Sequence, residues 1–362
     1  SSIVGQLYKP GDLRVDAGYT IFYMSINIGS MLGFLVCGYL GEKVGWHWGF
    51  GAAGIGMTFG VIQYILTKKS LGNAGLEPNL SPGEDNSSYK TIFIGASSLI
   101  FLIILTNFLG FWSIEAELLN RITVYIILFV AVLYFIYLFL FAGLTKPEKQ
   151  NISMLLLLFL GSVLFWAGFD QGGSSLNLFA KDYTDLFIFG WEMPATFLQV
   201  ANPLMVVIFA PIFAGFWVNL GRRNLDFDTP EKFALGCFLM AIGFCIILFG
   251  VEIALDQEKA GVKWLLLTYL FHTFGELCLS PVGLSATAKY SPKRYRSQMM
   301  GIWFLSSSLA AGLAGLLASE AFESGISTMP ALFNQIILAL VCVGIILIFA
   351  NKYVRGNIEI EE

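Results

Sequence analysis

The sequence has little charge for its length. Asp, Glu, Lys and Arg make up 13% of its 362 residues, about half the share of ordinary soluble domains. So few charged side chains exclude the water-exposed surface of such a domain. In their place, 56% of the residues are hydrophobic and the mean hydropathy is +0.73. The composition indicates a lipid environment.

Residues for metal or nucleophile chemistry are also scarce. The two histidines, His47 and His272, lie far apart, and no HxxxH or CxxC spacing is present. The odd number of cysteines, all within apolar runs, indicates neither a disulfide framework nor a metal site. A membrane-embedded enzyme would need a cluster of residues that acts as a nucleophile or binds a metal. We therefore expect no enzyme activity, no metal and no cofactor, and no basic patch suggests nucleic-acid binding.

Ten apolar runs have the length of about twenty residues that a helix needs to cross a bilayer. A large soluble helical protein would instead show polar faces at helical spacing, and Ile122 to Leu144 shows none. The sequence therefore predicts an all-α membrane protein with ten spanning helices. The expected spans are 17–40, 45–67, 91–112, 121–143, 151–180, 194–219, 231–251, 262–288, 298–318 and 330–350.

The basic residues are divided unevenly between the two sides that alternating spans define. One side holds 16 of the 21 Lys and Arg residues and the other holds five. By the positive-inside rule, both ends of this chain are expected in the cytoplasm. No charged segment precedes an apolar run near Ser1, so no signal peptide is visible, and we expect the start to be a cut in a longer chain.

Composition divides the chain into four parts. Residues 1–70 hold two spans, and the Gly-, Pro-, Asn-, Ser- and acid-rich stretch at 71–90 is typical of a solvated loop. Residues 91–143 hold two spans with almost no polar side chain, which are expected to face lipid nearly all round. Residues 144–362 hold six spans with Gly, Pro and isolated polar residues, which in transporters line the substrate path.

Two acidic residues, Asp170 and Glu276, lie where a helix should be immersed in the membrane. A carboxylate at the centre of a spanning helix costs about 2.5 to 3.5 kcal/mol, so it usually serves the movement of ions or substrates. A buried carboxyl group whose neighbouring cation comes and goes can take up and release a proton. These two residues are therefore candidates for proton coupling.

Other polar side chains share helical faces with these acids. Ser174, together with Trp166 and Asn177, recurs with Asp170 at helical i, i+4, i+8, i+11 spacing and therefore falls on one face with it. His272 falls on the face of Glu276, in a helix expected to break at Pro281. His272 could relay protons to Glu276, or it could only hydrogen-bond to a neighbouring helix.

Three further segments carry polar or aromatic residues on one face. A carboxamide can both donate to and accept from a peptide group, although hydrogen bonding between helices is the alternative use. Tryptophan in a membrane helix also serves packing or the interface. The residues are Tyr19, Tyr23 and Asn27 in the first span, Gln199 and Asn202 before Pro203, and Trp303 and Ser307.

Five of these segments together resemble the proton-dependent oligopeptide transporter (POT) family of the major facilitator superfamily. YTIFYMSINIGSM is similar to its fifth helix, FWAGFDQGGSS to its seventh and QVANPL to its eighth. GELCLSPVGLS and QMMGIWFLSSS are similar to its tenth and eleventh helices. The pair of spans at 91–143 is similar in position to the extra helix pair of bacterial members, so the resemblance implies a bacterial protein.

The resemblance also implies roles for individual residues. Glu276 matches the helix-ten glutamate associated with the amino terminus of the peptide, and Asp170 resembles the helix-seven carboxylate tied to coupling, where members with Glu have a longer side chain. The implied substrate-binding residues are Tyr23, Asn27, Trp166, Asn202, Glu276, Trp303 and Ser307. Secondary candidates are Tyr19, Ser174, Gln199 and His272.

The resulting expectation is symport of di- and tripeptides with protons by alternating access, in a monomer in the bacterial cytoplasmic membrane. A facilitator for nitrate, a sugar or an amino-acid-like solute is one alternative. A scaffold in which both acids can be neutralised without effect is another. The family's ExxER motif on helix one and its helix-four lysine have no counterpart here, so this stretch alone is not expected to transport.

Overall fold

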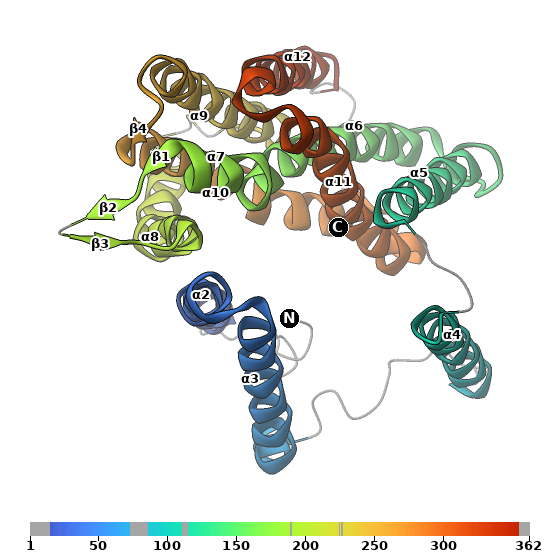
Figure 1. Ribbon diagram of the computed structural model, residues 1–362. Coiled ribbons are helices and arrows are strands. Elements are labelled where there is room, and N and C mark those ends of the chain that lie inside the picture. Colours follow the sequence, from blue (N-terminus) through green and yellow to red (C-terminus); the bar gives the residue numbers. More distant parts are fainter. Residues whose placement is uncertain are drawn as a thin grey trace. The chain divides into compact units, whose positions relative to one another are not determined.

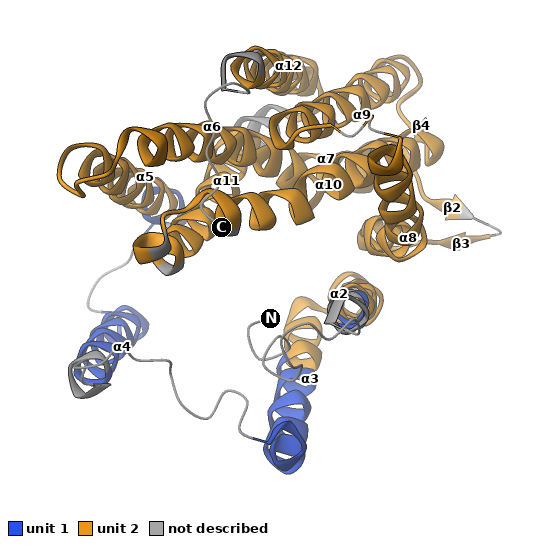
Figure 2. Cartoon of the chain, turned by 180° about the vertical axis from the view of Figure 1, so that it is seen from behind, with its two compact units in different colours: residues 1–26, 54–119 blue, residues 27–53, 120–362 orange. Residues whose placement is uncertain are grey.

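The computed structural model describes residues 15–72, 86–110, 115–188, 190–223, 225 and 227–354. Almost all of the described residues are helical (Figure 1). The chain forms two compact units, residues 1–26 with 54–119 and residues 27–53 with 120–362 (Figure 2). Helices α2 and α3 contribute residues to both units.

The ten expected spanning helices are confirmed, because ten helices in the described part of the chain are long and apolar enough to cross a membrane. Each overlaps one of the runs expected from the sequence. They are Met24–Val44, Trp46–Leu71, Lys90–Phe108, Glu117–Leu140, Lys146–Tyr183, Ala195–Arg222, Thr229–Gln257, Lys263–Thr287, Gln298–Ser319 and Gly325–Asn351.

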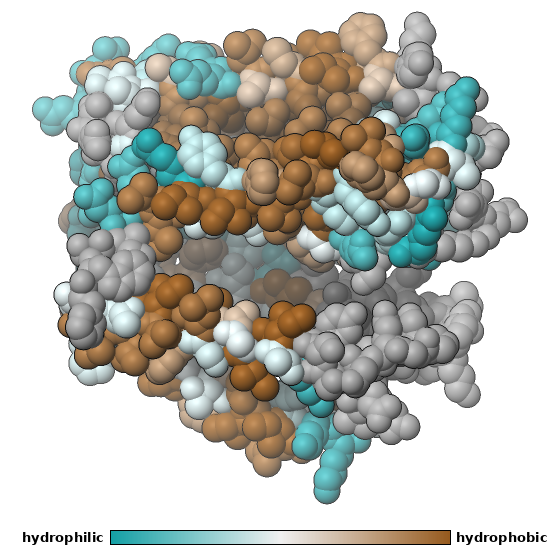
Figure 3. All heavy atoms as spheres, turned by 90° about the vertical axis from the view of Figure 1, so that its right-hand side faces the viewer, coloured by the Kyte–Doolittle hydropathy of each residue, from teal (hydrophilic) through white to brown (hydrophobic). Residues whose placement is uncertain are grey.

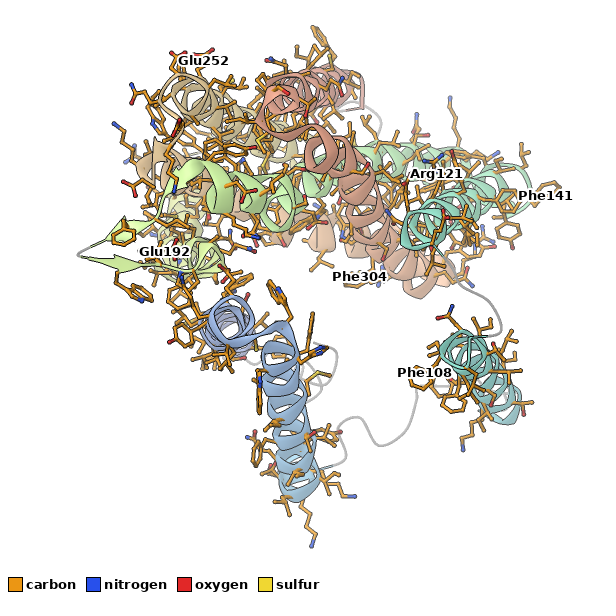
Figure 4. The ribbon with its side chains drawn as sticks, in the orientation of Figure 1. Phe108, Arg121, Phe141, Glu192, Glu252 and Phe304 are labelled. Atoms are coloured by element: carbon orange, nitrogen blue, oxygen red, sulfur yellow. The ribbon has the colours of Figure 1, made fainter. Side chains whose placement is uncertain are left out.

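The first unit contains the start of α2 (Val15–Leu32), most of α3 (Trp46–Thr67) with the short helix η3 (Lys68–Leu71), and α4 (Asn86–Phe108). Every described side chain of α4 except Thr106 is exposed. Phe108, at its end, is 85% exposed (Figure 4). This unit therefore presents apolar side chains where a soluble protein would need polar ones.

The second unit holds the packed core. It contains the end of α2, two π-helical turns, η1 (Gly33–Cys37) and η2 (Leu40–Val44), and the start of α3. Its remaining long helices are α5 (Ala116–Leu140), α6 (Lys146–Phe169), α8 (Ala201–Arg222), α9 (Thr229–Gln257), α10 (Lys263–Tyr290), α11 (Arg296–Ser324) and α12 (Met329–Val354). Helix α9 packs between α10 and α12, and α6 packs against α11 and α12.

Small residues let these helices approach closely. A Cβ atom on Gly275 of α10 would lie 2.7 Å from the backbone oxygen of Gly236 of α9, so the two backbones touch here. Small residues at helix interfaces serve this purpose in membranes. Away from such contacts the surface remains apolar, and Figure 3 shows broad hydrophobic areas on the face it presents. Phe141 and Phe304 are 74% and 56% exposed (Figure 4).

Helix α5 does not face lipid all round, which corrects the expectation for the second span of the 91–143 pair. Its side chains Val124, Ala131, Phe135 and Leu138 are buried. Its Asn120 Nδ2 donates to the backbone oxygen of Gly312 in α11 at 3.1 Å. The sequence shows few polar groups in this span, but apolar packing against α6 and α11 needs none.

The span expected over 151–180 is present, but it is not one regular helix. Helix α6 ends at Phe169, η4 (Asp170–Gly173) is a 3₁₀ turn, and α7 (Ser175–Tyr183) follows. Ser174 has φ −122° and ψ −100°, outside the helical region. Two consecutive glycines before it make such a change of direction inexpensive. The ideal-helix spacing from Trp166 to Asn177 therefore does not hold across the break.

The expected break at Pro281 is also wrong, because α10 continues through it to Tyr290. A proline removes one intrahelical hydrogen bond, and membrane helices tolerate this loss when neighbouring helices pack around it. The result is one long helix, which carries Tyr269, His272, Thr273 and Glu276 within about two turns.

Two small sheets lie between helices of the second unit. Strand β1 (Thr184–Asp185) pairs in parallel with β4 (Ala260–Gly261), with Thr184 opposite Ala260. Strands β2 (Phe187–Ile188) and β3 (Trp191–Glu192) form an antiparallel hairpin that leads to the 3₁₀ helix η5 (Ala195–Val200) and α8. The last 3₁₀ helices, η6 (Lys293–Tyr295) and η7 (Gly325–Thr328), precede α11 and α12.

Candidate functional site

A cavity of about 500 Å³ lies within the second unit. Its wall is formed by α2 and η1, the break between α6 and α7, η5 with the start of α8, α10, and α11. The lining residues are Ser30, Phe34, Phe169, Asp170, Gly172, Gly173, Ser174, Gln199, Asn202, Tyr269, His272, Ala311, Ala314 and Gly315. Five candidates from the sequence, Asp170, Ser174, Gln199, Asn202 and His272, are therefore brought together.

A hydrogen-bonded network joins α8 to α10 at this wall. Nδ2 of Asn202 donates to Oε2 of Glu276 at 2.9 Å and to Oγ1 of Thr273 at 3.0 Å. Thr273 in turn donates to the backbone oxygen of Tyr269 at 2.7 Å. Glu276 is 9% exposed and Thr273 is fully buried. Asn202 and Glu276, 74 residues apart in sequence, thus form one polar unit.

The break between α6 and α7 positions Asp170 on another part of the wall. The fully buried Gln171 stabilises this turn, because its Nε2 donates to the backbone oxygen of Ala314 in α11 at 3.3 Å and its Oε1 accepts from Ser174 and Ser175. Asp170 itself is only half-buried. Among the described residues, its carboxylate has no hydrogen-bond or ion-pair partner. It is therefore available to accept a hydrogen bond from a ligand or to bind a proton.

Two more side chains on α10 face this region. His272 lines the cavity and is 2% exposed, with its ring 4.8 Å from that of Phe244 and against Gly243. Its Nε2 and the hydroxyl of Tyr269 are buried and have no hydrogen-bond partner among the described residues. The relay from His272 to Glu276 stays a prediction. Tyr269 was not expected, since one tyrosine in an apolar run gives no distinctive pattern.

Gln199 is hydrogen-bonded to a side chain of another helix. Its Nε2 donates to Oδ1 of Asn177 in α7 at 3.0 Å. The bond ties the start of α8 to the helix that follows the break. Interhelical hydrogen bonding, the alternative left open for Gln199, is thus present, although Gln199 also lines the cavity.

The aromatic candidates and Ser307 lie outside the cavity lining. Trp166 packs against Phe165 and Phe169, with ring centroids 5.5 and 5.0 Å away. Trp303 is 8% exposed and packs edge-on to Phe233. Ser307 is exposed, whereas its neighbour Ser306 is buried and bonded to Ser162. Their contacts with substrate stay predictions.

Of the candidates in the first span, Asn27 is buried, at 8% exposure. The backbones of Tyr19 and Tyr23 belong to α2, but their side chains lie outside the described part of the chain. Within the described residues, no group of three or more His, Cys, Asp and Glu side chains could hold a metal ion.

The π-helical turn η2 is hydrogen-bonded to the start of η5. The carboxylate of Glu42 accepts from the backbone N–H groups of Ala195 and Thr196 at 3.0 and 2.9 Å. Lys43 Nζ lies 2.8 Å from Glu192 Oε2 in the β2–β3 hairpin. The Lys43 ammonium, hydrogen-bonded to this carboxylate, lowers the pKa of Glu192.

Comparisons with known proteins give a consistent result. The family model described as PTR2, POT family, matches residues 1–334. The peptide transporter YePEPT of Yersinia enterocolitica is 35% identical over 98% of this chain and 71% of its own length. A di-/tripeptide transporter of Lactococcus lactis is 31% identical over 85% of this chain and 63% of its own length.

A solved peptide transporter POT in complex with sulfate superposes with a TM-score of 0.86 and 34% identity, over 99% of this chain and 72% of that one. The agreement covers the helices that carry Asp170, Asn202 and Glu276. Sequence and fold lead to one conclusion: this chain, an integral membrane protein of the major facilitator type, belongs to the POT family.

Proposed function

We propose that this protein imports di- and tripeptides together with protons by alternating access, in which two helical bundles rock about a central cavity. The observation that carries this proposal is the 2.9 Å hydrogen bond between Asn202 and Glu276 at the cavity wall. A carboxamide and a carboxylate together can bond the amide and ammonium groups that every short peptide has. The names of the relatives, a peptide transporter and a di-/tripeptide transporter, support the same substrate class.

Proton coupling is assigned to Asp170 and Glu276. Both are acidic residues within spanning helices, where a carboxylate is costly unless it moves ions or substrate. Asp170 lines the cavity and Glu276 is bonded to a cavity-lining residue. The energy source is therefore a proton gradient, and the candidate peptide contacts include Tyr23, Asn27, Trp166, Trp303 and Ser307 beside Asn202.

The proposed location is the cytoplasmic membrane, with the cytoplasmic side set by the basic residues. The ten described spanning helices follow the same order as the expected spans, which place 16 Lys and Arg residues on one side and five on the other. Both ends of this chain are thus assigned to the cytoplasm. We assign function to the monomer, and the four-part division with a six-helix bundle over 144–362 remains part of the proposal.

The test is uptake of labelled dialanine into liposomes that contain the protein expressed from its complete reading frame. An inward proton gradient should drive accumulation in the parent, and Glu276→Gln should lose at least tenfold of it. Glu252→Gln is the matched control, because Glu252 is an exposed carboxylate on α9 that does not line the cavity (Figure 4). Equal gradient-driven uptake by the parent and Glu276→Gln contradicts the assigned role.

Competition separates this function from transport of another solute. Excess unlabelled dialanine should inhibit uptake, whereas nitrate, glucose and free alanine should not. If a folded parent takes up no dialanine under any gradient, the peptide assignment is wrong and the family fold remains.

A further inference from the structure

The donors and acceptors around Thr273 can be assigned completely. A backbone carbonyl only accepts, so the single hydroxyl proton of Thr273 is used in its 2.7 Å bond to the oxygen of Tyr269. Oγ1 of Thr273 must therefore accept in its 3.0 Å contact with Asn202. The group of Asn202 that faces α10 is consequently the NH₂ and not the carbonyl.

This orientation limits what Asn202 can offer to a ligand. A carboxamide nitrogen carries two protons, and here one is directed to Thr273 and the other to Glu276. Only the carbonyl oxygen, Oδ1, remains for the cavity that Asn202 lines. The assignment relative to Thr273 does not depend on the charge of Glu276, since it follows from the backbone carbonyl of Tyr269.

We propose that Thr273 is a positioning residue: its hydroxyl orients the Asn202 carboxamide so that the site presents an acceptor, Oδ1, to an N–H group of the peptide. This inference rests on the proposed function. It adds Thr273, which does not line the cavity, to the residues of the site. It also predicts that a substrate with an N–H donor binds better than one that lacks this donor. A site built for one hydrogen bond leaves its own polar group unpaired when the partner is missing.

The α10 helix offers a matched control. Thr268 is also fully buried, and its hydroxyl bonds to the oxygen of Trp264 four residues back, as that of Thr273 bonds to Tyr269. The one hydroxyl proton of Thr268 is shared between the backbone oxygens of Trp264 and Gly243, at 2.8 and 3.1 Å, and Thr268 has no bond to Asn202. Thr268→Val removes an equivalent hydroxyl without touching the proposed contact.

The experiment measures binding of dialanine and of its analogue with an N-methylated peptide bond to the purified full-length protein. The parent should prefer dialanine by about two- to tenfold, the range for one hydrogen bond. Thr273→Val, which keeps the shape of the side chain, should lose that preference. Thr273→Ser, which keeps the hydroxyl, and Thr268→Val should retain it. Thr273→Ala provides a second variant without the hydroxyl if Thr273→Val does not fold.

The preference ratio distinguishes positioning from stability, because a variant that is merely less stable binds both ligands less. An unchanged ratio in Thr273→Val or Thr273→Ala overturns the proposal, as does a parent with no preference for dialanine over its analogue. In both cases the parent still binds dialanine and the proposed function is retained. A parent that binds neither ligand contradicts the proposed function itself, and the inference with it.

Discussion

Trp303 fills a space that only a glycine at position 283 leaves open. A Cβ atom on Gly283 of α10 would lie 2.3 Å from Cζ2 of the Trp303 indole in α11. The rigid indole is buried and packs edge-on to Phe233, whose Cζ would itself lie 3.1 Å from the added Cβ atom. We expect Gly283→Ala to lower the free energy of unfolding by about 1 to 3 kcal/mol, as overpacking of a core does.

The control for this variant is Gly301→Ala, on the helix that carries Trp303. A Cβ atom there meets nothing within 4 Å. Alanine is also the better helix former, so this change should be neutral or slightly stabilising. Thermal unfolding in detergent gives the melting temperature of both variants. Equal melting temperatures would show that the absence of a side chain at Gly283 is not needed for the packing of Trp303.

Glu42 holds the start of η5 through two backbone N–H groups, those of Ala195 and Thr196. Charge-assisted hydrogen bonds at a helix start are among the stronger ones. Glu42→Gln should therefore speed hydrogen exchange at these two amides by about tenfold, whereas Glu252→Gln should leave them unchanged. Exchange read by mass spectrometry checks this, and unaltered protection would contradict the bonding.

Glu192 gives a pH dependence whose sign follows from its lowered pKa. Lys43 stabilises the charged carboxylate in the folded protein, so the folded pKa lies below the ordinary value of 4.5. The stabilisation is present above pH 4.5 and is lost as the pH falls through the folded pKa. The difference in melting temperature between the parent and Glu192→Gln should thus be constant from pH 8 to about 5 and then shrink. A difference that grows on acidification contradicts this assignment.

The packing of α5 on α11 depends on Gly312. A Cβ atom at this position would lie 2.3 Å from Cγ2 of Val124, a side chain with little rotamer freedom. We expect Gly312→Ala to cost about 1 to 3 kcal/mol. Val124→Ala should recover most of that loss in the double variant, because the two positions share one contact. Additive effects in the double-mutant cycle would show that they do not.

The positions of the spans could be predicted because lipid imposes a length and a composition on each helix. The number of spans and their order follow from the apolar runs alone, and Asp170 and Glu276 stand out because charge is rare within them. The break at η4 could not be placed in the same way. Gly172 and Gly173 permit both a helix and a turn, and the buried Gln171, bonded to α11, decides between them.

Contacts between distant segments were beyond what the sequence could predict. Thr273 is one of several threonines in apolar runs, and only the position of Asn202, 71 residues earlier, gives it a partner. The error at Pro281 has the opposite cause. A local rule suggested a break, but α10 continues through the exposed Pro281 to Tyr290, because membrane helices tolerate the loss of one backbone hydrogen bond.

Helices α6 and α9 begin with the same arrangement, a capping box with a proline next to it. Thr145 pairs with Glu148 beside Pro147, and Asp228 pairs with Glu231 beside Pro230. Each helix therefore has a fixed first residue and cannot gain a turn at that end. In a bilayer thicker than its own apolar length, the bundle has to respond by thinning the lipid around it or by extending its flanking polar side chains to the interface. The rate of transport should accordingly depend on the acyl-chain length of the surrounding lipid.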